Sequence, residues 1–103
     1  AFQLIDLQED DEVILPSFTI VSCLSAVIRS KAKPVFCDVK PDSWNMSLEQ
    51  VMEKVTKKTK AILMVHIYGL PSEAKEIAKF CKSREWRIMW LLWRYFNLKF
   101  LRQ

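Results

Sequence analysis

The chemistry-bearing residues of this chain are few, and they stand at the ends of apolar runs. The single histidine, His66, closes such a run and is followed by Tyr68 and Gly69. An imidazole and a phenol at the end of a strand can move a proton or bind a substrate, although the same groups also bond loop backbone. Hydroxyl groups stand near a second strand–helix junction, at Ser17, Thr19 and Ser22. Helix capping explains these hydroxyls. No pair of nucleophile and base can be assembled, so the pattern predicts no catalytic residue.

Metal and disulfide chemistry is not indicated either. The thiols are Cys23, Cys37 and Cys81, an odd number of widely spaced residues without a CxxC pair. We therefore expect buried free thiols in a reducing cytosol, and neither a disulfide framework nor a zinc site. Asp38 and Asp42 follow another apolar run without an evident partner.

Composition excludes further classes of function. With one glycine in 103 residues, a glycine-rich phosphate loop is excluded. Residues 1–85 carry equal numbers of basic and acidic residues, so the net charge of +4 comes from residues 86–103 and no basic face indicates nucleic acid. The first twelve residues are not typical of a signal peptide, and no apolar run reaches the roughly 20 residues that span a bilayer.

The remaining residues predict elements that alternate between strands and helices. Apolar runs predict buried strands over 12–16, 34–39 and 61–68. Helical spacing predicts helices over 17–33, 47–55 and 72–83, with a helix end over 1–8. Ser17 or Thr19 is expected to cap the first of these helices, and Ser47 with Gln50 has the spacing of a capping box. Trp44 is expected to pack on the body of the domain.

This order predicts one small α/β domain with a mostly parallel sheet flanked by helices. Parallel neighbours need right-handed crossovers, and each predicted helix is long enough to supply one. The rhythm also predicts another strand after residue 85, and "WRIMWLLW" is apolar enough to begin it.

Four blocks in order carry a resemblance to a known family. They are "DDEVILPSFTI", "AKPVFCDV", "DSWNMS" and "KTKAILMVHIYGLP". Over about residues 10–84 the chain resembles the DegT/DnrJ/EryC1/StrS sugar aminotransferases. The resemblance implies a piece of the large domain of a fold-type I enzyme that uses pyridoxal phosphate. It further implies a cytoplasmic homodimer that moves an amino group from glutamate to a keto sugar on a nucleotide.

The resemblance also implies how much of the cofactor site is present. Ile20 falls at the position of the aromatic residue that stacks on the cofactor ring, and it is the one cofactor-binding residue expected here. The family's phosphate loop would precede Ala1, and its Schiff-base lysine would follow Gln103, so covalent binding of the cofactor is not expected. Trp90 and Leu91 stand where the family has the acid pair that includes the partner of the pyridinium nitrogen.

Three interpretations of the function remain open. In the first, residues 1–85 are a partial aminotransferase domain that is inactive as an isolated chain, and residues 86–103 are a basic aromatic tail foreign to the family. In the second, that tail is an amphipathic helix that binds a membrane surface or a partner, which makes the chain an interaction module. A third reading has the chain regulate an intact aminotransferase subunit by pairing with it.

Overall fold

The first three strands of the molecule are short, mostly apolar runs, and each is followed along the chain by a helix. The computed structural model describes residues 6–66, 73–84 and 87–92, with the backbone alone at residues 66, 74 and 87–92. In chain order the elements are β1 (Glu12–Pro16), α1 (Val21–Arg29), β2 (Lys33–Cys37), α2 (Leu48–Lys54), β3 (Thr59–His66), α3 (Ala74–Ser83) and β4 (Arg87–Leu92).

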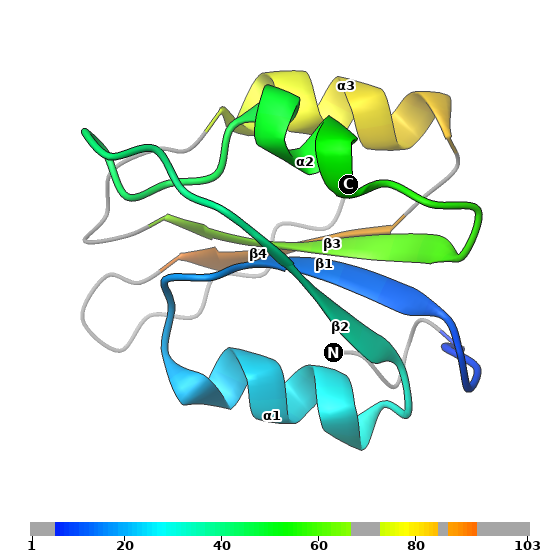
Figure 1. Ribbon diagram of the computed structural model, residues 1–103. Coiled ribbons are helices and arrows are strands. Elements are labelled where there is room, and N and C mark those ends of the chain that lie inside the picture. Colours follow the sequence, from blue (N-terminus) through cyan, green and yellow to red (C-terminus); the bar gives the residue numbers. More distant parts are fainter. Residues whose placement is uncertain (1–5, 67–72, 85–86, 93–103) are drawn as a thin grey trace.

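The four described strands form one parallel sheet in the order β2-β1-β3-β4. Figure 1 shows α1 on one face of this sheet and α2 with α3 on the other. The predicted α/β class and the parallel sheet are therefore confirmed. Joining parallel neighbours through helices covers both faces, which is why the strands read as continuous apolar runs.

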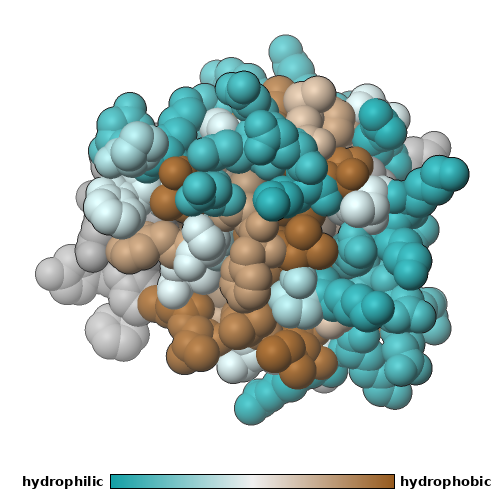
Figure 2. All heavy atoms as spheres, in the orientation of Figure 1, coloured by the Kyte–Doolittle hydropathy of each residue, from teal (hydrophilic) through white to brown (hydrophobic). Residues whose placement is uncertain are grey.

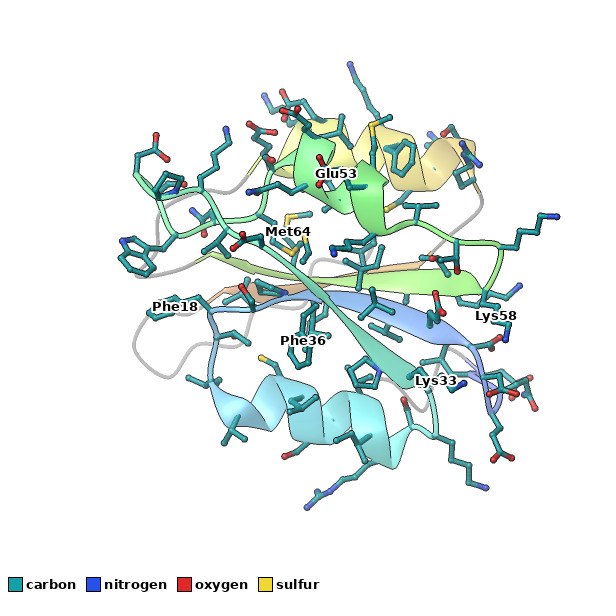
Figure 3. The ribbon with its side chains drawn as sticks, in the orientation of Figure 1. Phe18, Lys33, Phe36, Glu53, Lys58 and Met64 are labelled. Carbon is teal, nitrogen blue, oxygen red and sulfur yellow. The ribbon has the colours of Figure 1, made fainter. Side chains whose placement is uncertain are left out.

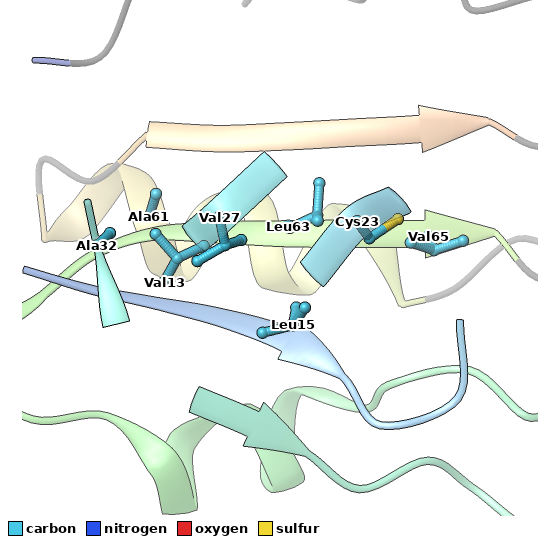
Figure 4. Close-up of a cluster of buried hydrophobic side chains, with 8 residues drawn as sticks. All are labelled: Val13, Leu15, Cys23, Val27, Ala32, Ala61, Leu63 and Val65. Carbon is cyan, nitrogen blue, oxygen red and sulfur yellow. The ribbon is translucent and has the colours of Figure 1, made fainter. Parts of the chain in front are cut away.

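Side chains of the central strands alternate between two cores. Towards α1 lies a cluster around Leu15, Val27 and Leu63, which Figure 4 shows in close-up. Towards α2 and α3 lies a second cluster that contains Ile14, Ile62 and other residues. The period of two along β1 and β3 sends successive residues to opposite faces, so that one strand serves both cores.

The second core also buries residues of the helices and of the loop before α2: Met46, Val51, Ile77 and Cys81. Figure 2 shows hydrophilic side chains over α2 and α3, whereas apolar side chains gather lower in the view, around β2 and α1. Ile28 of α1 and Phe36 of β2 are among the exposed apolar residues.

The predicted capping box of α2 is confirmed. The N–H of Gln50 donates to the Ser47 hydroxyl at 3.2 Å, and the Ser47 N–H donates to the Gln50 side chain at 3.2 Å. Both bonds satisfy donors that the first helical turn leaves without an intrahelical partner.

The predicted cap of α1 is wrong. Ile20 occupies the N-cap position with an extended backbone, and no side chain caps the helix. The Thr19 hydroxyl donates to the Cys23 sulfur at 3.4 Å instead. Because the helix begins one residue later than a cap by Thr19 requires, and three later than a cap by Ser17 requires, the apolar Ile20 stands at its start.

Two elements were expected at the ends of the chain, a helix end over residues 1–8 and a strand after residue 85. Residues 6–8 are not helical, and residues 1–5 lie outside the described residues. The strand expected after residue 85 is confirmed as β4, so the helix proposed for the tail is wrong over residues 87–92. Hydrogen bonding to β3 along six register pairs favours the strand there. The rest of the tail lies outside the described residues.

Candidate functional site

The carboxyl ends of β1 and β3 mark the place where a ligand would bind such a sheet. From β1 the chain moves through α1 to β2 on one side, and it later returns past β1 to β3 on the other side. The direction of winding therefore reverses between β1 and β3. In open α/β sheets this reversal opens a crevice beyond the carboxyl ends of the strands. The residues at the carboxyl ends of the strands therefore form the candidate site.

The loop from β1 to α1 brings Ile20 to this edge. The Ser17 N–H donates to the carbonyl oxygen of Cys37 at 2.8 Å, which ties the start of the loop to the end of β2. Ile20 follows with φ −72° and ψ 147° and leaves 41% of its surface exposed. An exposed aliphatic side chain at a helix start can contact a flat ring, but it has no polar atom to bind one.

An aromatic pair links this loop to the one after β2. The rings of Phe18 and Trp44 lie 4.8 Å apart between centroids, at an interplanar angle of 47°. Figure 3 shows Phe18 at this edge, with Lys33 and Lys58 at the opposite end of the sheet. Trp44 thus packs on Phe18, as a loop anchor would, while half of its own surface stays exposed.

The backbone of the second loop is held in an uncommon conformation. Trp44 has φ 60°, in the left-handed region that a bulky residue rarely adopts. The Trp44 N–H donates to the Lys40 carbonyl at 2.8 Å, and the Lys40 N–H donates to the Asn45 carbonyl at 2.9 Å. These two bonds close the loop and fix the direction in which Trp44 leaves it.

A charged contact joins the same loop to the start of α3. The Lys40 ammonium donates to the Glu73 carboxylate, whose other oxygen accepts the Leu48 N–H at 2.9 Å. Donation from Lys40 and from the Leu48 backbone lowers the pKa of Glu73, and the Glu73 carboxylate raises the pKa of Lys40. The Lys40 ammonium is therefore already bound to the Glu73 carboxylate at the carboxyl ends of the strands.

The other residues singled out in the sequence do not come together as a catalytic group. His66 is the last residue of β3, whereas Tyr68 and Gly69 lie outside the described residues. Asp38 accepts the N–H of its neighbour Val39 at 2.8 Å, a local contact.

Ser17 and Thr19 make the contacts given above. All three cysteines are buried and free, as predicted. In the part of the chain that the structure describes, no three His, Cys, Asp or Glu side chains cluster as metal ligands.

The end of β4 lies at the same edge. Met64 pairs with Trp90, Val65 with Leu91 and His66 with Leu92. The last residues of β4 thus stand beside the last residues of β3, and none of them is acidic.

Sequence reasoning missed two links at this edge, between Lys40 and Glu73 and between Phe18 and Trp44. Each joins residues more than twenty positions apart, and no local spacing indicates such a contact.

Membrane insertion through a helix finds no support among the described residues. None of their helices combines the length and the apolar character that crossing a bilayer requires.

Known proteins resemble the chain over most of its length. A sequence model of the DegT/DnrJ/EryC1/StrS aminotransferase family matches residues 1–89. A dTDP-4-dehydro-2,3,6-trideoxy-D-glucose 4-aminotransferase from Saccharopolyspora spinosa is 43% identical over 82 residues, which are 80% of this chain and 21% of the relative. A GDP-perosamine synthase from Escherichia coli O157:H7 is 38% identical over 84 residues, or 82% of this chain and 23% of the relative.

Solved structures agree with these relatives. An aminotransferase from Psychrobacter cryohalolentis superimposes with a TM-score of 0.83 at 30% identity, over 86% of this chain and 22% of its own. A 3-amino-5-hydroxybenzoic acid synthase gives a TM-score of 0.82 at 31% identity, over 87% of this chain and 23% of its own. The chain thus spans between a fifth and a quarter of the length of these proteins. With a family match from residue 1 to residue 89 and the same fold, the chain belongs to the DegT/DnrJ/EryC1/StrS aminotransferase family.

Proposed function

We propose that this chain forms one wall of the pyridoxal phosphate site of a nucleotide-sugar aminotransferase, and that the 103 residues alone do not transaminate. The family and its solved structures depend on pyridoxal phosphate, and one structural relative was determined with the bound pyridoxamine form of the cofactor. The names of two relatives include dTDP- and GDP-linked sugars, which supports a keto sugar on a nucleotide as the substrate class.

The residues present fit only part of the cofactor. Pyridoxal phosphate acts as an electron sink when a lysine holds its aldehyde and an acid holds its ring nitrogen protonated. Ile20 offers an apolar contact to the ring. Among the described lysines, Lys40 at this edge is bound to Glu73, and Lys33 at the opposite end of the sheet is paired with Asp10. The described residues therefore do not make a complete site, and no catalytic step can be assigned to them.

The end of β4 is the observation that carries the proposal. The register with β3 places Leu91 and Leu92 at the carboxyl edge of the sheet, beside Val65 and His66. β3 borders the reversal of winding, so the end of β4 lies one strand away from the crevice expected there. The family resemblance expects an acid at Leu91, and an aliphatic side chain can neither accept the pyridinium proton nor stabilise the positive charge on the ring.

Absorbance of pyridoxal phosphate tests the proposal. The purified chain is titrated with the cofactor, treated with borohydride, and digested to find any modified lysine. Glutamate is then added, and conversion of the cofactor to its amine form is followed. We expect no stable aldimine band and no conversion, while far-UV circular dichroism confirms that the chain is folded. A band that one lysine substitution abolishes, together with conversion by glutamate, would overturn the proposal.

Two single variants test the acid and the aromatic residue that the family resemblance expects at Leu91 and Ile20. Leu91→Asp restores the acid without supplying a lysine, so we expect it to leave the chain inactive. Ile20→Phe restores an aromatic at the ring position and should strengthen non-covalent quenching of protein fluorescence by the cofactor. Activity in either single variant would show that the chain already supplies the lysine, and it would overturn the proposal.

Several further expectations rest on the family alone. Its enzymes are generally oligomeric. Homodimerisation, a cytoplasmic location, a tail foreign to the family and pairing with an intact subunit stay proposals for this chain. Pull-down with a full-length relative tests the last of these, and co-sedimentation of the tail peptide with anionic vesicles tests membrane binding.

A further inference from the structure

One carboxylate links three elements at the carboxyl ends of the strands. Glu73 occupies the N-cap position of α3, yet its side chain does not cap that helix. Its carboxylate instead accepts the Leu48 N–H, at 2.9 Å, and the ammonium of Lys40. Leu48 is the first residue of α2, and its N–H is one of the donors that a helix start leaves without an intrahelical partner. Glu73 therefore ties the start of α3 to the start of α2 and to the loop after β2.

Lys40 closes this loop, which spans residues 38–47, and also connects it to the helices. The Lys40 carbonyl oxygen accepts the Trp44 N–H, and the Lys40 N–H donates to the Asn45 carbonyl, so both of its backbone groups bond within the loop. Its ammonium leaves the loop and reaches Glu73, 33 positions along the chain. The ion pair thus holds the closed loop on the helical layer of α2 and α3.

The same loop brings Trp44 to Phe18. Trp44 has φ 60°, a backbone conformation that a bulky residue keeps only where its surroundings hold it. Its ring lies 4.8 Å from that of Phe18, between centroids. Phe18 belongs to the loop of residues 17–20, which leads to α1 on the other face of the sheet (Figure 1). The contacts from Glu73 to Phe18 therefore run from one helical layer to the loop that enters the other.

We propose that Glu73 is a positioning residue of the candidate site. Through Lys40 it holds Trp44 against Phe18, and this aromatic contact fixes the loop that presents Ile20. The role rests on the proposed function, in which Ile20 offers an apolar contact to the cofactor ring. Glu73 acts through other residues, so it sets the geometry of the wall and takes no part in a reaction step.

An effect on the loop can be separated from an effect on global stability. The side chains of Lys40 and Glu73 are 40% and 38% exposed, and an exposed ion pair contributes little to the free energy of unfolding. Loss of the pair should therefore leave the sheet and its helices folded. The contact between Trp44 and Phe18 depends on the geometry of the loop, so this contact should respond.

Fluorine NMR of the full chain, labelled with fluorotryptophan, tests this role. The chain has four tryptophans, and Trp44→Phe identifies the signal of Trp44. In the native chain, Phe18→Leu should shift this signal because it removes the neighbouring ring. In Lys40→Met or Glu73→Ala, the same Phe18→Leu substitution should shift the signal less, because the two rings are then no longer held together.

Two control variants make the result specific to the contact between Lys40 and Glu73. Lys33→Met breaks the ion pair with Asp10 at the opposite end of the sheet (Figure 3). Asp42→Asn removes another carboxylate that raises the pKa of Lys40. In both controls, Phe18→Leu should shift the Trp44 signal as far as it does in the native chain.

Several outcomes overturn the proposal. They are the absence of a shift on Phe18→Leu in the native chain, the full shift in a folded Lys40→Met or Glu73→Ala variant, and a reduced shift in either control. Far-UV circular dichroism shows whether each variant is folded. If Glu73→Ala unfolds because the Leu48 N–H loses its acceptor, Lys40→Met decides alone, and its unfolding overturns the proposal. No cofactor is used, so a failure here is distinct from a failure of the proposed function, which the cofactor titration tests.

Discussion

The stability of the fold should fall between about pH 9 and pH 11 because two buried thiols must ionise. Cys37 and Cys81 lie in the core beneath α2 and α3, and burial raises the pKa of each thiol to about 11, from 9.0. In this window the folded chain keeps protons that the unfolded chain has released. The free energy of unfolding therefore falls as pH rises from the unfolded pKa towards the folded pKa.

The magnitude follows from the size of the shift. One pKa unit corresponds to about 1.4 kcal/mol, so each thiol accounts for a loss of about 3 kcal/mol at most, and less at intermediate pH. Urea denaturation at a series of pH values measures this loss. The matched variant is Cys37→Ala with Cys81→Ala, which is less stable at neutral pH but should lose less stability with pH. Because lysine and tyrosine titration is common to both proteins, the difference in slope reports the thiols. Equal slopes would refute the reasoning.

Three further predictions concern the core, the cap of α2 and the charged contact. Ile62→Ala should lower the free energy of unfolding by about 2–5 kcal/mol because it leaves a cavity in the core beside the central strand. Phe36 is exposed, so Phe36→Ala should change the free energy of unfolding by no more than about 0.5 kcal/mol. Ser47→Ala should cost about 0.5–2 kcal/mol in urea denaturation because it removes the capping box, and an unchanged midpoint would contradict that role. Since Lys40 lowers the pKa of Glu73, the contribution of Glu73 is present above its unfolded pKa and is lost as pH falls through the folded value. Glu73→Gln should therefore flatten the loss of stability below about pH 4.5, as measured by acid titration of circular dichroism.

Features that depend on neighbouring residues could be read from the sequence. Continuous apolar runs predicted the three strands over 12–16, 34–39 and 61–68, and the observed strands agree with them to within two residues. The spacing of Ser47 and Gln50 predicted the capping box because its bonds join residues three positions apart. The parallel class followed from continuous apolar runs that do not alternate with polar residues, as expected where helices cover both faces.

Features that depend on the placement of whole elements could not be read in this way. The predicted cap of α1 was wrong because the helix begins at Val21, so that Ile20 and not a hydroxyl residue occupies the N-cap position. The contacts of Phe18 with Trp44 and of Lys40 with Glu73 arise when loops from different strands meet at one edge. Their partners are known only once the strand order is known.

Residues 87–92 show why the spacing of apolar residues alone does not decide between a helix and a strand. Apolar residues at spacings of three and four predicted a helix, yet a run that is apolar at nearly every position satisfies the period of a strand equally well. Pairing with β3 then decides in favour of the strand, since it adds a hydrogen-bonded ladder along residues 87–92. A helix would have left the position of Leu91 relative to the sheet undefined. As a strand, β4 carries Leu91 to the carboxyl edge, beside the end of β3 and on the same edge as Ile20. The position at which the family resemblance expects an acid therefore lies at the candidate site, and this supports the proposal that the chain alone does not transaminate.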